Sequence, residues 1–598
     1  MSLRRWLTVV LSALVVSAVL SPVTAAQRSV DPLEPGPHPT AVEGYQLGDS
    51  AFTVPGFPGP IELTGAVHHP RDLGKGPYPV VVLVHGSHQL CDHSGAARLA
   101  RDPRQPGASP ADEGDPPGWP CAEGERPIPN FRGYDYLATV LASHGFVAVS
   151  VSSNGVEAAE LVDGGPDDWR GMDARARLID HHLRLWRQWS APGSEAFGGR
   201  FRGALDLDRV ATVGHSRGGE GVLYHARTQR GGGAYRLRAL VQLAPTNMFR
   251  QPATGVPTAT VLPYCDGDVN TLEGAHQYDD SRYLAEAEAA PRYLVTLGGA
   301  NHNYFNTVWS PSSGAYHARD DWLGRPPAAC APGTATRLTE GQQRVAAVGL
   351  VTSFVRLHLA GVAGFGPLWT GRVPVPSALA PAGALVSYQA PARSRLDVNR
   401  FTAAESLTTN TAGGAVRATG FATAGLCGGT HRTANCLAKA GTDAIGNEPH
   451  RDLQGRPGLR FLRLTWSSPG ARLVNELDSA ADGRHHQAVR FRVAVDFTDP
   501  LNPVDRPQAL RVVVRDAAGR SGSALVPAGS PALAYPPRFD NRDTARRFLF
   551  QQVRVPLAAF IGSAGSAGFD RARIRSVELV FDATASGAVG ISDLSLGE

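Results

Sequence analysis

The first 370 residues alternate between short apolar runs and longer segments with the apolar spacing of a helix. Tyr78–Val84 is almost continuously apolar and rich in β-branched residues, which is typical of a strand buried on both faces. Tyr134–Gly145 and Thr339–Leu359 instead place their apolar residues along one helical face. Further buried strands are expected at Phe146–Val151, Val210–Val213, Thr258–Pro263 and Arg292–Leu297. This alternation predicts an α/β fold, a mostly parallel sheet flanked by helices.

The pattern changes after Pro374–Ala384, a stretch rich in Pro, Gly and Ala that indicates a linker. Beyond it, apolar and polar residues alternate and turn residues intervene, as in half-buried strands. Such strands are expected at Gln487–Asp496, Ala509–Arg515, Phe548–Leu557 and Ile574–Phe581. This second part therefore predicts an all-β, jelly-roll-like sandwich of antiparallel strands.

A chain of 598 residues is too long for a single core, and these patterns divide it. We expect a signal peptide at residues 1–26, a proline-rich lead-in at 27–43 and an α/β domain at 44–370. A linker at 371–390 and the β-sandwich at 391–598 complete the expected order.

The first residues indicate export. Arg4 and Arg5 precede an apolar run from Trp6 to Leu20, and Val23–Ala26 supplies small residues for cleavage. This pattern predicts a secretory signal peptide and a secreted, extracellular protein. The paired arginines leave twin-arginine export open beside general secretion. No later segment is long and apolar enough to span a bilayer.

The segment Gly214-His-Ser-Arg-Gly-Gly219 carries the clearest chemistry. A β-branched run stops at Gly214, Ser216 follows, and a helical pattern continues from Gly219. Such a strained turn between a strand and a helix lifts a serine hydroxyl above the edge of a sheet. We therefore expect Ser216 to be a nucleophile.

A serine nucleophile needs a base and an acid, which follow it in α/β-hydrolases in the order Ser, acid, His. The strand at 258–263 leads into Asp266 and Asp268, and the strand at 292–297 leads into a glycine-rich loop with His302. We expect His302 to be the base. We prefer Asp268 as the acid, because such folds usually place it a few residues past the strand end, and Asp266 is the alternative.

An oxyanion hole is the fourth expected element. The strand that begins at Tyr78 ends in His85-Gly86-Ser87, and we expect the backbone N–H groups of Ser87 and Arg217 to bind the oxyanion. His85 precedes the nucleophile and is a structural or pocket residue rather than the base. Three aromatic residues after the base either line a substrate pocket or belong to the core beneath the loop: Tyr304, Phe305 and Trp309.

These motifs resemble those of α/β-hydrolases of the chlorophyllase, cutinase-like and platelet-activating-factor acetylhydrolase type, over about residues 44–362. The resemblance implies a Ser-acid-His hydrolase without a cofactor. The ending Phe581–Leu596 is similar to the last strands of galactose-binding-like sandwiches, which implies a carbohydrate or polymer surface as a partner; a purely structural sandwich is the alternative. The insertion between Cys91 and Cys121 departs from the family and alters the expected pocket shape.

Six cysteines fit an exported protein, although their connectivity cannot be derived from the sequence. Proximity favours Cys91–Cys121 and Cys427–Cys436, which leaves Cys265 with Cys330. His85, His88, Cys91 and His93 lie close in sequence, but they lack zinc-type ligand spacing, so we expect no metal. The net charge of +4 does not imply nucleic-acid binding.

We therefore expect a secreted serine esterase or lipase that cleaves small or polymeric carboxylic esters through an acyl-enzyme. A peptidase or amidase with the same triad is the second hypothesis, and a non-catalytic extracellular binding protein is the third. The linker leads us to expect that the α/β domain hydrolyses small esters without the sandwich.

Overall fold

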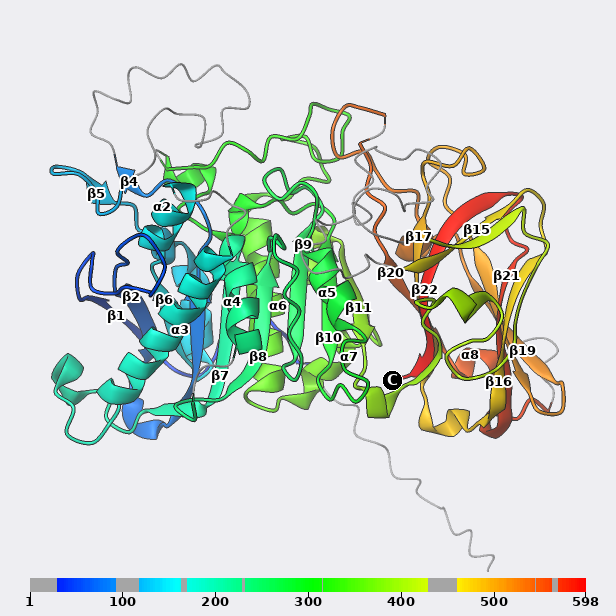
Figure 1. Ribbon diagram of the computed structural model, residues 1–598, viewed down its shortest axis with the longest axis horizontal. Helices are drawn as coiled ribbons and strands as arrows, with labels where there is room; N and C mark the ends of the chain where they lie inside the picture. The colour runs from blue at the N-terminus through cyan, green and yellow to red at the C-terminus, as the bar shows by residue number, and fades with distance from the viewer. Residues whose placement is uncertain are drawn as a thin grey trace, which may run out of the picture.

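The structure, a computed structural model, describes residues 30–92, 118–162, 169–228, 232–314, 316–427, 460–543, 545–561 and 568–598. Figure 1 shows two regions side by side: an α/β region with a large twisted sheet, and a β-sandwich toward the C-terminus. The predicted fold class is thereby confirmed. The expected signal peptide, His93 and Cys436 lie outside the described residues.

The α/β region is built, within the described residues, on one sheet of nine strands in the order β1-β2-β6-β3-β7-β8-β9-β10-β11. The inner strands from β6 to β10 run parallel, and β1, β2 and β11 add antiparallel strands at the edges. Their bounds are β1 Thr40–Gln46, β2 Thr64–Pro70, β3 Tyr78–Val84, β6 Val147–Val151, β7 Leu205–His215, β8 Leu237–Leu243, β9 Thr258–Pro263, β10 Arg292–Leu297 and β11 Ala384–Gln389. A small hairpin pairs β4 (Cys91–Asp92) with β5 (Arg126–Pro127).

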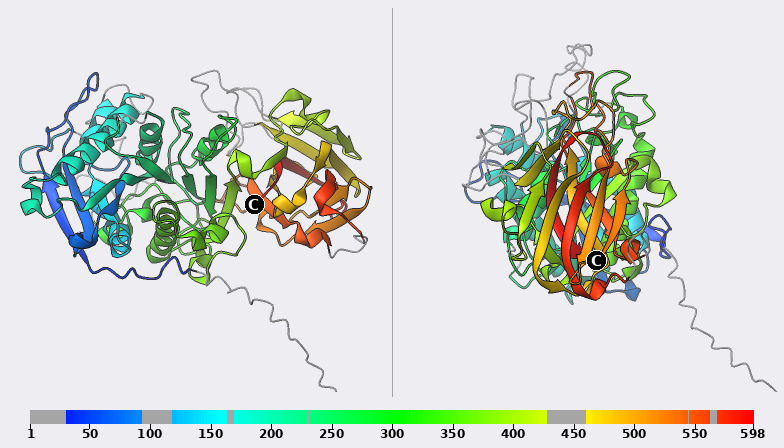
Figure 2. Two further views of the ribbon diagram at one scale, coloured as in Figure 1. Left: turned by 90° about the horizontal axis from the view of Figure 1, so that it is seen from below. Right: turned by 90° about the vertical axis from the view of Figure 1, so that its right-hand side faces the viewer.

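Helices cover both faces of this sheet (Figure 2). Successive side chains of β3 point to opposite faces: Val81 packs in one core with α1 and α6, whereas Val82 packs in another with α3 and α4. All seven residues of β3 are therefore buried, as its apolar run predicts. The helices are α1 Asp135–Ser143, α2 Asn154–Val162, α3 Arg170–Trp189, α4 Arg217–Thr228, α5 Ala275–Ser281, α6 Glu340–His358 and α7 Gly366–Trp369.

The expected linker requires a correction. Residues 384–389 form β11, which pairs antiparallel with β10 from Ala384 beside Leu297 to Gln389 beside Arg292. The Pro, Gly and Ala residues of Pro374–Ala384 follow the last helix of the α/β region, α7. The apolar residues that come next form the edge strand of its nine-stranded sheet. The α/β region therefore extends through Gln389.

The β-sandwich consists of two antiparallel sheets. One has the order β14-β15-β22-β17-β20 with β12 also on β22, and the other has the order β13-β16-β21-β18-β19. Their bounds are β12 Leu396–Asn399, β13 Val416–Thr419, β14 Thr423–Cys427, β15 Phe461–Trp466, β16 Ala471–Ala481, β17 Ala488–Val495, β18 Leu510–Asp516, β19 Ser521–Val526, β20 Gln551–Pro556, β21 Ile574–Phe581 and β22 Gly587–Gly597; α8 spans Ala558–Ile561. The inner faces share one apolar core that includes Trp466, Phe491 and Phe581.

Strand β17 shows how the two regions are joined. Phe491 points into the sandwich core, but its neighbours Arg490 and Arg492 are also buried. Arg490 donates to Thr370 O at 2.7 Å, and Arg492 pairs with Asp279 on α5. The alternation that predicts a half-buried strand is present, but its polar face meets the α/β region instead of water.

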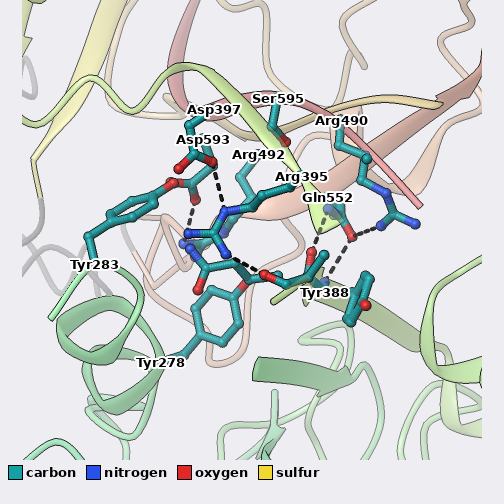
Figure 3. A pocket seen from close by; sticks show the side chains of 13 residues that line it. Tyr278, Tyr283, Tyr388, Arg395, Asp397, Arg490, Arg492, Gln552, Asp593 and Ser595 are labelled. Atoms are coloured by element: carbon teal, nitrogen blue, oxygen red, sulfur yellow. Dashed lines mark hydrogen bonds and ion pairs between the residues drawn. The ribbon is translucent and has the colours of Figure 1, made fainter. Parts of the chain in front are cut away.

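The interface is polar (Figure 3). Arg282 of the α/β region pairs with Asp593 of β22, and Gln552 of β20 accepts a hydrogen bond from Tyr388 N at 2.9 Å. Asp593, Gln552 and Tyr388 line a pocket with a volume of about 20 Å³, enough for one water-sized molecule. This pocket is too small for an ester substrate.

Two disulfides lie in the α/β region. Cys91 is bonded to Cys121, and Cys265 is bonded to Cys330, with Cα atoms 5.7 and 5.2 Å apart. Both pairs agree with the expected connectivity, and disulfides of this kind are compatible with an extracellular protein. Among the helices of the described residues, none combines the length and apolar character that crossing a membrane requires.

Candidate active site

Ser216 occupies a sharp turn between β7 and α4. Its φ of 57° lies in the left-handed region, which is strained for a residue with a side chain. A Cβ at Gly214 would lie 2.1 Å from Gly218 O, and a Cβ at Gly218 would lie 2.5 Å from His85 O. The two glycines of the motif are therefore required by close backbone contacts, and the turn has the geometry of a nucleophile elbow.

The loops after β9 and β10, which carry Asp266 and His302, meet at the same edge of the sheet. β9 and β10 run parallel, so their carboxyl ends place Asp266 and His302 together. His302 Nδ1 donates to Asp266 Oδ2 at 3.0 Å, and both side chains are about 1% exposed. A buried carboxylate on Nδ1 fixes the tautomer that leaves Nε2 to accept a proton.

Asp268 lies on the other side of the same imidazole. Its Oδ2 is 3.1 Å from His302 Nε2, and its side chain is 42% exposed. The sequence preference for Asp268 as the orienting acid is therefore at odds with this arrangement, in which Asp266 holds Nδ1. Asp266 Oδ1 also accepts from Asp268 N at 3.1 Å, so one carboxylate makes the turn contact typical of aspartate and also binds His302.

The carboxylates around His302 control its charge. Burial favours the neutral imidazole, but Asp266 and then Asp268 outweigh it and raise the pKa of His302 to about 10. Asp321 adds to this effect. The resting histidine is therefore stabilised as an imidazolium by its surroundings.

Asp321, which the sequence pattern does not identify, binds both the loop of Asp266 and the loop of His302. Its Oδ1 accepts from Gly267 N at 2.9 Å and from His302 N at 3.0 Å. Its Oδ2 accepts from Asn303 N at 2.7 Å. Asp321 lies between β10 and α6, where no strand or helical pattern marks a role.

His215 links the elbow to the base loop. Its Nδ1 accepts from the Tyr134 hydroxyl at 2.9 Å, and its Nε2 donates to His302 O at 3.0 Å. His215, the residue before Ser216, thus binds the backbone of the loop that carries His302. In the described residues, Ser216 Oγ and His302 Nε2 are not hydrogen-bonded, and catalytic contacts of this kind are often long without substrate.

The expected oxyanion donors flank Ser216. A Cβ at Gly86 would lie 2.4 Å from Ser216 Cβ, so the backbone just after β3, which continues into Ser87, lies close to Ser216. Arg217 is the first residue of α4, and the N–H groups of a first helical turn have no partner inside the helix. The Arg217 side chain points to Glu160 Oε2 at 2.9 Å. Both expected donors thus lie next to Ser216 in the chain or in space.

His85 has a structural position. Its Nε2 accepts from Ser153 N and its Nδ1 donates to Gly86 O, both at 2.8 Å. Burial lowers the pKa of His85 to about 3, so the ring stays neutral. His85 therefore joins the loop after β3 to the loop after β6.

The three aromatic residues that follow His302 differ in their burial. Phe305 and Trp309 are wholly buried, and the Trp309 ring is parallel to that of His302 with centroids 6.5 Å apart. Trp309 Nε1 donates to Asn130 Oδ1 at 2.9 Å. Tyr304 is half-buried, with the Arg337 guanidinium 5.7 Å from its ring centre. Phe305 belongs to the main apolar core of the α/β region, whereas Trp309 is buried against the rings of His215 and His302.

No model of a protein family matches this chain. The bis(hydroxyethyl) terephthalate hydrolase of Streptomyces coelicolor is similar to it, with 25% identity over 322 residues, which are 51% of this chain and 78% of that protein. The chain is therefore a distant homologue of an ester hydrolase, in agreement with its mostly parallel sheet and flanking helices.

Proposed function

We propose that this protein is a secreted serine hydrolase of carboxylic esters in which Ser216 is the nucleophile, His302 the base and Asp266 the orienting acid. The observation that carries the proposal is the buried contact of Asp266 Oδ2 with His302 Nδ1 beside the elbow of Ser216. Asp266 takes the place of Asp268 in this proposal, because a carboxylate on Nδ1 leaves Nε2 to receive the serine proton.

The mechanism follows from these positions. Neutral His302 takes the proton of Ser216 as Oγ attacks the ester carbonyl, and the oxygen of the tetrahedral intermediate accepts from the N–H groups of Ser87 and Arg217. The imidazolium then gives its proton to the leaving alkoxide, and an alcohol departs from the acyl-enzyme. Water, activated by His302, releases the carboxylic acid and restores Ser216.

The similarity to a bis(hydroxyethyl) terephthalate hydrolase supports an ester of an aromatic acid as a substrate. The test is turnover of bis(hydroxyethyl) terephthalate and of p-nitrophenyl esters of graded chain length, beside peptide anilides. Ester turnover with no anilide cleavage is the expected result. Anilide cleavage without ester cleavage would replace the esterase by the amidase hypothesis.

The proposed function does not include a carbohydrate site in the sandwich. No aromatic side chain in the described part of the sandwich is largely exposed, so no ring there presents an open face for stacking on a sugar. The aromatic residues that form its core are Phe401, Phe461, Trp466, Phe491, Phe548, Phe550, Phe560 and Phe581.

Gly86→Ala is expected to lower kcat/KM on p-nitrophenyl esters by roughly 100-fold, the effect of moving a reacting group by about an ångström. The new Cβ would lie 2.4 Å from Ser216 Cβ and 2.9 Å from Oγ, so the nucleophile or the oxyanion strand must shift. Gly341→Ala in α6 is the matched control, because a Cβ there meets nothing within 4 Å. Equal activity of the two variants would contradict the placement of Gly86 at the nucleophile.

Asp268→Asn is expected to move the acid limb of the kcat/KM–pH profile to lower pH by roughly one unit, since an adjacent carboxylate stabilises the imidazolium. His302 must be neutral to act as a base, and its raised pKa keeps it protonated over a wide range. Loss of the Asp268 charge lowers that pKa, whereas Asp266 and Asp321 remain. Asp208→Asn, at the far end of β7 and 79% exposed, should leave the profile unchanged. A limb that stays in place or moves to higher pH would refute this role of Asp268.

A further inference from the structure

One segment of the β-sandwich reaches the loop that carries Asp266. It joins β19 to β20, and Arg547 within it is only 1% exposed. Arg547 Nε donates to Tyr264 O at 2.8 Å, its Nη2 donates to Asp266 O at 3.2 Å, and its Nη1 donates to Asn270 O. A single guanidinium thus binds three carbonyls of the acid loop, residues 264–270.

The same segment packs against the acid loop around this guanidinium. The Phe539 ring centre lies 4.2 Å from the Arg547 guanidinium carbon, and Phe539 and Ala545 share an apolar cluster with Tyr264 and Cys265. The Tyr264 hydroxyl donates to Pro537 O at 2.7 Å. The acid loop and this segment of the sandwich therefore form one packed unit.

The disulfide partner of the acid loop is held by the same segment. Cys330 is bonded to Cys265, and the preceding residue Ala329 donates through its N–H to Arg538 O at 2.9 Å. Asn541 Nδ2 donates to Arg325 O at 2.8 Å. The sandwich thus contacts the acid loop directly. It also contacts the segment around Cys330, which the disulfide joins to that loop.

The chemistry of the loop explains why an arginine suits this position. A buried irregular loop must satisfy its carbonyl groups, and the planar guanidinium offers five donors in a fixed fork. One of the bound carbonyls belongs to Asp266 itself, whose carboxylate holds His302 Nδ1. A shift of the Asp266 backbone would therefore move the carboxylate away from the imidazole.

We propose that the β-sandwich is a working part of the catalytic unit and that Arg547 is the positioning residue through which it holds Asp266 against His302. This inference rests on the proposed function, since it assigns Arg547 to the same triad. It replaces the expectation that the α/β domain hydrolyses small esters without the sandwich: a chain that ends near Pro374 lacks Arg547 and also lacks β11.

The test uses the full chain with Arg547→Gln, Arg547→Lys and the matched control Arg490→Gln. Arg490 is a buried arginine that also joins the sandwich to the α/β region, but it binds Thr370 O rather than the acid loop. On a p-nitrophenyl ester we expect Arg547→Gln to lower kcat by roughly 10- to 100-fold with little change in KM, because the triad is misplaced and the substrate surface is not. Arg547→Lys replaces the forked guanidinium by a single ammonium and should have an intermediate kcat. Arg490→Gln should retain the full kcat.

A double-mutant cycle separates positioning from a general loss of stability. In an Asp266→Asn background the carboxylate that Arg547 positions is already absent, so Arg547→Gln should then lower kcat by less than about threefold. Circular dichroism and thermal unfolding monitor the fold of each variant. If Arg547→Gln does not fold, the same cycle with Arg547→Lys carries the test.

Two patterns of kcat loss among the variants would overturn the inference. One is an equal loss of kcat in Arg547→Gln and Arg490→Gln, and the other is additive losses in the cycle with Asp266→Asn. An active wild type with full kcat in Arg547→Gln overturns the inference alone and leaves the triad in place. A wild type that hydrolyses no ester overturns the proposed function and the inference together.

Discussion

Ser216→Ala is expected to abolish ester hydrolysis, with a fall in kcat of roughly a million-fold, the loss seen when a nucleophile that acts as a unit with its base is removed. Ser216 stands at the strained turn between β7 and α4, next to both expected oxyanion donors. Without Oγ there is no atom to form the acyl-enzyme. The measurement is turnover of a p-nitrophenyl ester, together with covalent labelling by a fluorophosphonate, which should modify the wild type at Ser216 and leave the variant unlabelled.

Ser353→Ala is the matched control for this experiment. Ser353 is also buried and hydrogen-bonded, on α6, where its Oγ accepts from Trp369 Nε1 at 3.0 Å. This variant should keep both turnover and labelling. Hydrolysis by the Ser216→Ala protein at a substantial fraction of the wild-type rate would exclude Ser216 as the nucleophile.

The elbow could be predicted from the sequence because its determinants are local. An apolar run ends a strand, two glycines permit close backbone contacts, and a helical pattern follows. The structure places the strand end at His215 and the helix start at Arg217. The three strand ends that carry Ser216, the acid loop and His302 were likewise predictable, since each follows a buried apolar run and parallel strands share one carboxyl edge.

The choice between Asp266 and Asp268 is not a local property. Both carboxylates stand in one short loop, and either could reach an imidazole at the sheet edge. The loop that carries them is held by contacts with Asp321 and Arg547, which lie far away in the sequence. No periodicity in the segments that carry these two residues marks a contact with the loop.

The same limit applies to the boundary between the two regions. Composition marks Pro374–Ala384 as a linker, but pairing with β10 makes β11 part of the first sheet. In β17 the alternation of apolar and charged residues cannot say whether the charged face meets water or another surface. Arg490 and Arg492 contact the α/β region. A pattern of hydrophobic and polar positions cannot predict an interface made of buried arginines.

Asp266→Asn is expected to lower kcat by roughly 10⁴-fold, the cost of an amide in place of the orienting carboxylate of a serine triad. Asp266 Oδ2 lies 3.0 Å from His302 Nδ1, with both side chains buried. An amide at this position no longer holds the proton on Nδ1 or stabilises the imidazolium that forms in the transition state. The measurement is kcat on a p-nitrophenyl ester at the pH optimum of each variant.

The comparison with Asp268→Asn makes this prediction decisive. Asparagine at position 266 keeps the volume of the side chain and an oxygen that accepts from Asp268 N, the turn contact of Asp266 Oδ1, so the loop should retain its shape. Asp268→Asn removes a carboxylate beside Nε2 that is 42% exposed and should leave kcat within about tenfold of the wild type, as expected for a charge partly screened by water. If Asp268→Asn instead lost most of its kcat and Asp266→Asn kept it, the orienting acid would be Asp268. The buried contact of Asp266 with His302 Nδ1 would then be structural.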